Sequence, residues 1–98
     1  MPEIVDALIA FLSAHLDERE RRANHREEWT HEEIRFVLAD VAAQRELLTL
    51  ILGQLASQPP PGHTLGEVLD HKMPWIRALK LLALPYAEHS GYREEWRP

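Results

Sequence analysis

The chain has 98 residues, with 11 Lys+Arg against 16 Asp+Glu, which gives a formal net charge of −5. This length fits one small domain, and the acidic balance argues against a nucleic-acid binder, which normally carries a basic surface. No cysteine is present, so disulfides, thiolate metal sites and a cysteine nucleophile are excluded.

The sequence predicts a soluble protein with the cytoplasm as its location. The first residues, Met1-Pro2-Glu3-Ile4, show neither the basic nor the apolar region of a secretory signal. The longest strongly apolar stretch is residues 47–52, far shorter than the roughly 20 residues that cross a bilayer. We therefore expect no membrane segment.

The first predicted helix covers about residues 3–23, which contain neither Gly nor Pro. Apolar side chains recur along one helical face at Ile4, Val5, Leu8, Phe11, Leu12 and Leu16. His15 lies on the same stripe, and we interpret it as a core or edge histidine rather than a metal ligand.

A charged hinge is predicted at residues 24–30, before a capping box from Thr30 to Glu33 that starts the next helix. His25, Glu28 and His31 lie around this hinge. Imidazole and carboxylate groups bind zinc and other divalent cations, so these three residues are candidate metal ligands. Apart from this alternative, we expect no cofactor.

The second predicted helix, about residues 31–57, carries a seven-residue repeat of apolar positions interrupted by Arg45. We interpret Arg45 as an ion-pair partner of Asp17, Glu20 or a C-terminal Glu; the alternative is an anion anchor in a pocket. Beyond Glu46 this helix is apolar on several faces, which predicts that two other short helices or a second copy of the chain cover it.

A stiff loop at residues 58–63 is predicted from its prolines, followed by a second capping box from Thr64 to Glu67. The third helix is predicted over about residues 65–89. We expect it to be broken near Pro74, because the residue before a proline avoids helical angles. Residues 90–98 form the predicted tail.

The segment 81–96, LLALPYAEHSGYREEW, resembles the C-terminus of an uncharacterised family of small actinobacterial proteins, a domain of unknown function. Residues 11–20 resemble its N-terminal helix and residues 31–48 its central helix. The resemblance implies no activity. Many relatives have a longer middle region with Cys and His; here a Cys-free loop at 59–64 takes its place, so any zinc site there would lack its thiolates.

The aromatic residues near the C-terminus are further candidates for binding. Tyr86, His89, Tyr92 and Trp96 alternate with charged residues. They are interpreted as a strap whose rings are buried on the bundle, or as a docking strip for a partner, since Tyr and Trp are favoured at interfaces. Deleting residues 91–98 would separate the two interpretations.

Together these patterns predict an all-α fold, a small bundle of three main helices. No catalytic residues are identified, because the sequence shows no nucleophile motif and no phosphate-binding loop. Our leading hypothesis is a non-enzymatic interaction or accessory protein that forms a homodimer and has a possible protein partner. The alternative is a His/carboxylate metal-binding protein, with or without hydrolytic activity.

Overall fold

Three helices make up most of the computed structural model, which describes residues 3–58 and 60–98. No strand occurs in these ranges, so the predicted all-α fold with three main helices is confirmed. The helices are α1 (Glu3–Asn24), α2 (His31–Ala56) and α3 (Leu65–Ala83), followed by the short 3₁₀ turns η1 (Leu84–Tyr86) and η2 (Glu94–Trp96).

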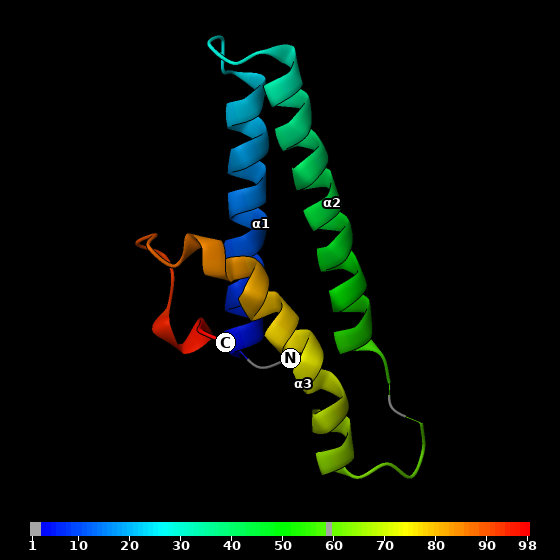
Figure 1. The fold of residues 1–98 in the computed structure, drawn as a ribbon. Helices are drawn as coiled ribbons and strands as arrows, with labels where there is room; N and C mark the ends of the chain where they lie inside the picture. Colours follow the sequence, from blue (N-terminus) through cyan, green and yellow to red (C-terminus); the bar gives the residue numbers. More distant parts are fainter. Residues whose placement is uncertain (1–2, 59) are drawn as a thin grey trace.

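The helices α1 and α2 form an antiparallel hairpin, and α3 crosses its lower half (Figure 1). The hydrophobic core lies where the three helices meet, and the apolar stripe of α1 supplies four of its buried side chains. Burial of this stripe is what stabilises α1 as a helix, since helical propensity alone is a weak force. The core consists of Val5, Leu8, Leu12, Leu16, Val41, Leu48, Ile51, Leu55, Leu79, Ala83 and Trp96.

The capping box at Thr30 forms with both of its hydrogen bonds. Glu33 N donates to Thr30 Oγ1 at 3.1 Å, and Thr30 N donates to the Glu33 carboxylate at 2.8 Å. At the start of α3 only half of the predicted box forms. Glu67 N donates to Thr64 Oγ1 at 3.1 Å, but the Glu67 carboxylate pairs with His63 at 2.9 Å instead.

The third helix corrects the prediction of a break near Pro74, because α3 continues through this residue and ends at Ala83. Pro74 is exposed, so its ring faces water, while Trp75 and Ile76 on the next positions pack against the core. Core packing therefore holds the helix together across the one missing N–H. The predicted extension to residue 89 is replaced by η1, which contains Pro85.

The molecule is elongated, with Cα extents of 57 × 26 × 16 Å. Its radius of gyration is 16.0 Å, against about 13 Å for a compact domain of 100 residues. Figure 1 shows the reason: the far end of the α1–α2 hairpin is only two helices thick, and the first turns of α3 extend past the other two helices. Among the described residues, no helix is long and apolar enough to span a bilayer.

Candidate functional site

The C-terminal segment, residues 84–98, folds back onto α1 around the ring of Phe11. The ring centroid of Phe11 lies 5.0 Å from that of Trp96 and 6.1 Å from those of Tyr86 and Tyr92. A Cβ built on Gly91 would lie 3.4 Å from the Phe11 ring, an ordinary van der Waals distance, so the backbone at Gly91 borders this ring. Trp96 is 2% exposed. This arrangement supports the strap interpretation of the aromatic residues.

Two histidines meet at the edge of this cluster. The ring of His15 on α1 lies 4.3 Å from the ring of His89 in an edge-on arrangement, and it stacks on Tyr86 at 4.5 Å. Burial lowers the pKa of His15, and the charges of His89 and Arg22 lower it further, against an opposing effect of Glu18. The cluster therefore favours a neutral imidazole at His15.

A shallow pocket of about 390 Å³ lies beside Tyr86, where α1, α2 and the end of α3 meet. Its polar wall is an ion pair of Arg19 and Asp40 at 2.7 Å, and Gln44 donates to the same carboxylate at 2.9 Å. Burial acts to lower the pKa of Arg19, but Asp40 and Tyr86 raise it overall, so the guanidinium stays charged. The network ties α1 to α2.

Two polar atoms in the C-terminal segment are buried without a hydrogen-bond partner among the described residues: Tyr92 Oη and Trp96 Nε1. A buried donor without an acceptor destabilises a protein by about 1–3 kcal/mol. The two rings compensate through contact, because they meet edge-on at 5.6 Å, a favoured aromatic geometry.

Arg45 connects the two helices of the hairpin by charge. Its guanidinium donates to Asp17 at 2.7 Å and also to the carboxylate of Glu20, the partners that the ion-pair interpretation named. Glu20 and Asp17 raise the pKa of Arg45, which is already high. All three side chains keep contact with water, so this is a register contact rather than a buried anion site.

The candidate metal ligands around the hinge do not converge. His25 Nδ1 contacts the Arg21 carbonyl at 2.7 Å, while Glu28 pairs with Arg26 at 3.3 Å. His31 is exposed on the first turn of α2. Within residues 3–58 and 60–98, no three His, Asp or Glu side chains are arranged to hold a metal ion. The structure therefore gives the metal hypothesis no support.

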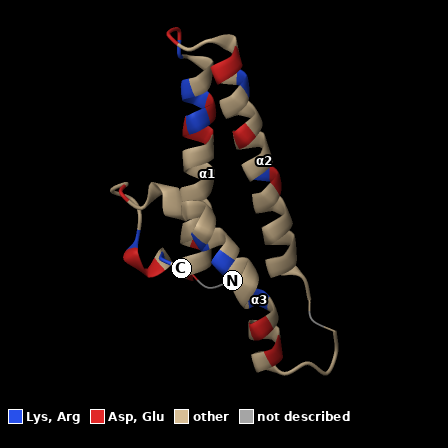
Figure 2. Cartoon of the chain, in the orientation of Figure 1, with Lys and Arg blue, Asp and Glu red and all other residues tan. Residues whose placement is uncertain are grey.

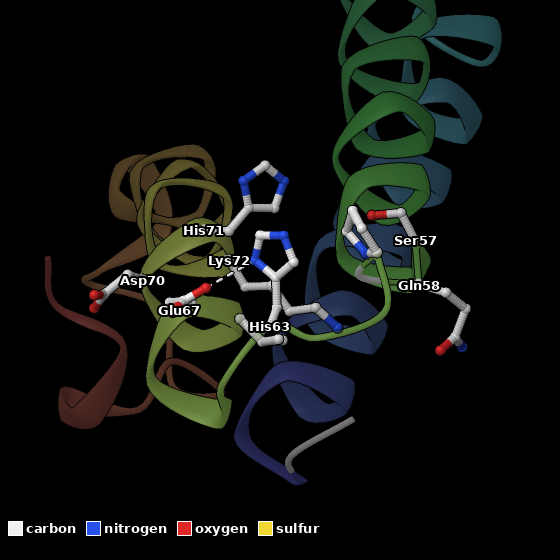
Figure 3. A pocket seen from close by; sticks show the side chains of 9 residues that line it. Ser57, Gln58, His63, Glu67, Asp70, His71 and Lys72 are labelled. Atoms are coloured by element: carbon white, nitrogen blue, oxygen red, sulfur yellow. Dashed lines mark ion pairs between the residues drawn. The ribbon is translucent and has the colours of Figure 1, made fainter.

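A second hollow, of about 490 Å³, lies between the end of α2 and the start of α3. Figure 3 shows His63 paired with Glu67 and His71 beside them, whereas the carboxylate of Asp70 points away. The pattern i, i+4, i+8 of these residues was visible in the sequence but was not singled out. The pocket therefore contains two imidazoles and one carboxylate that is already paired with His63.

Large apolar side chains remain exposed on three parts of the surface, with exposed fractions between 38% and 75%. One part is Leu81 and Leu84, where α3 ends and η1 begins. On α2 the exposed side chains are Phe36, Leu47 and Leu50, which we call the α2 stripe, and on the first turns of α3 they are Leu65, Leu69 and Met73, which we call the α3 start. The sequence predicts that α2 needs cover on several sides. The helices α1 and α3 cover part of it and leave Leu47 and Leu50 exposed.

Charge is distributed unevenly over the same elements. Figure 2 shows coloured charged residues concentrated at the hairpin end and an uncharged second half of α2. In the sequence, no Asp, Glu, Lys or Arg occurs from Leu47 to Gly66. The α2 stripe therefore runs into a neutral surface.

Comparison with known proteins identifies a family but no characterised relative. The model of a family of unknown function (DUF6221) matches residues 5–98, which agrees with the resemblance to a domain of unknown function. No curated protein and no solved structure matches the chain.

Proposed function

Since the chain belongs to DUF6221, a family of unknown function, we propose a function from its own surface: it is a non-enzymatic helical interaction protein that forms a homodimer. The observation that carries this proposal is the exposure of the α2 stripe and the α3 start. Large apolar side chains grouped on helices commonly mark an interface.

The exposed apolar area is sufficient for a dimer. If a fully exposed large side chain presents about 150 Å², the six residues of the two surfaces expose roughly 500 Å² together. A standard interface takes about 800 Å² from each partner, of which a little more than half is apolar. One copy therefore holds about the apolar area that a standard interface requires of it.

A second copy of the chain is the occupant that the charges favour. Each copy carries a net charge of −5, so two copies repel each other unless they meet on an uncharged face. Three of the six residues, Leu47, Leu50 and Leu65, lie in the segment 47–66, which contains no Asp, Glu, Lys or Arg. In a two-fold arrangement, the α3 start of each copy packs on the α2 stripe of the other. The same contact then forms twice, and both surfaces of each copy are covered.

The oligomeric state tests this proposal directly. Light scattering on a sizing column should give twice the chain mass of 11.4 kDa. Leu50→Glu and Leu65→Glu, one on each surface, should each convert the dimer to monomer while far-UV circular dichroism remains helical. Ala42→Glu is the matched control, because Ala42 is exposed on α2 but faces roughly 80° or more away from each residue of the stripe.

A wild-type monomer over the whole accessible concentration range would overturn the proposal, and so would a dimer that survives both glutamate variants. Association with a different protein is the alternative in that case.

We also propose a cytoplasmic location, supported by the lack of cysteine, because small secreted domains rely on disulfides. Cell fractionation checks this point.

A further inference from the structure

We propose that His15, packed against His89 and Tyr86, is a proton-sensitive latch, which holds the C-terminal segment on α1 while the His15 imidazole is neutral and weakens this hold when it is protonated. The rings of His15 and His89 lie 4.3 Å apart, on segments that are far apart in the sequence. His15 also stacks on Tyr86 at 4.5 Å and touches Phe11 at 4.4 Å. The latch does not depend on the proposed dimer.

His89 faces His15 from the C-terminal segment. Its Nδ1 accepts a hydrogen bond from Gly91 N at 3.4 Å, a contact within that segment. Burial of His15 among these rings disfavours its charged form, so a proton on His15 weakens the docked segment.

The surroundings offer little compensation for a positive charge. On α1, Glu18 is already bound by Arg21 at 2.6 Å and Arg22 at 2.8 Å, and Arg22 itself disfavours charge on His15. On α2, Asp40 is bound to Arg19.

Within the C-terminal segment, His89 is the charged neighbour that acts on His15, and the charge of Glu88 acts on Arg97. No carboxylate that acts on His15, other than the engaged Glu18, is found among the described residues. A protonated latch therefore has no partner to retain it.

The direction of the pH effect follows from proton binding. The pKa of His15 in the docked state is lowered, so the released state binds more protons below its usual pKa of about 6.5. Docking is therefore fully stable above about pH 6.5 and weakens as the pH falls below it. Each proton taken up on release changes the docking equilibrium by up to about tenfold per pH unit.

The segment can detach without unfolding the helices, because its backbone hydrogen bonds are internal. His89 N donates to the Tyr86 carbonyl, Tyr92 N to the His89 carbonyl, and Trp96 N to the Arg93 carbonyl, at 2.9–3.0 Å. No backbone hydrogen bond of the described residues joins the segment to α1. Side chains therefore link the segment to α1, through the aromatic rings around Phe11 and through Tyr86 beside Arg19, and the ring of Trp96 provides the readout.

The experiment follows the indole N–H signal of Trp96 by NMR, assigned with Trp96→Phe, from about pH 8 to pH 5. We expect the exchange protection factor of this group to fall as the pH drops below about 6.5, by at most about tenfold per pH unit. Far-UV circular dichroism should stay constant over the same range.

His15→Phe is the decisive variant, because phenylalanine keeps an aromatic ring against Tyr86 but takes up no proton. It should keep Trp96 protected at acidic pH, whereas the control His31→Gln, on the exposed first turn of α2, should respond like the wild type. The latch is refuted if wild-type protection does not change, if His15→Phe releases the segment over the same pH range, or if the helical signal is lost together with the protection.

Discussion

Replacing Trp96 with alanine should destabilise the protein more than any other change in the C-terminal segment. Trp96 is 2% exposed and packs on Phe11 at 5.0 Å and Tyr92 at 5.6 Å. Loss of a buried Trp typically costs about 3–5 kcal/mol. Removing the unpaired Nε1 returns part of this, since an unsatisfied buried donor itself costs about 1–3 kcal/mol.

We therefore expect Trp96→Ala to reduce the free energy of unfolding by about 3 kcal/mol, the lower end of that range. A domain of this size has a total of only about 5–15 kcal/mol. The melting temperature should fall by roughly 12–24 °C, at about 4–8 °C per kcal/mol. Trp96→Phe keeps the aromatic contacts and removes the unpaired N–H, so its loss should be about 1 kcal/mol or less.

Urea unfolding followed by far-UV circular dichroism measures these differences, provided that the slope of free energy against urea is unchanged. All variants are compared at one protein concentration, because dimer formation links stability to concentration. Trp29→Ala is the matched control, since this Trp lies partly exposed at the hinge. If Trp96→Ala costs no more than Trp29→Ala, the strap is not part of the core and the reasoning fails.

Three further changes test the helices by the same urea measurement. Arg45→Leu should change the free energy of unfolding by about 1 kcal/mol or less, because its carboxylate partners regain water; a loss above about 3 kcal/mol would show a stranded buried charge. Pro74→Ala should stabilise the protein by about 1–3 kcal/mol by restoring a helical N–H, and a destabilised variant would contradict the exposed setting of this ring. Thr30→Ala and Thr64→Ala should each cost about 1 kcal/mol, because each threonine Oγ1 accepts one backbone N–H at 3.1 Å; a loss near zero at either position would contradict the role of that cap.

The helices could be predicted from sequence because their signals are local. The apolar stripe of α1 and the capping box at Thr30 each depend on residues within a few turns. The continuity of α3 could not be predicted in this way. Whether a helix tolerates Pro74 depends on which side of it faces the core, and that is decided by packing between distant segments.

For the same reason, only part of the candidate site could be predicted from the sequence. A charged residue on an apolar stripe indicates a partner on the next helix, and Arg45 finds Asp17 and Glu20 there. The meeting of His15 with His89 leaves no such trace, because neither residue has an unusual local pattern. Their contact depends on how the C-terminal segment returns to α1, which local sequence does not encode.

The slender outline of the molecule limits where chemistry that requires a dry environment can occur. With a smallest Cα extent of 16 Å, the body is about two packed helices deep, since two helix axes about 10 Å apart with Cα radii of about 2.3 Å span roughly 15 Å. In residues 3–58 and 60–98 the interior is a single apolar layer that contains no charged group. A sheltered polar chamber, where fixed dipoles act without competing water, can arise in such a body only when a second molecule supplies the other wall.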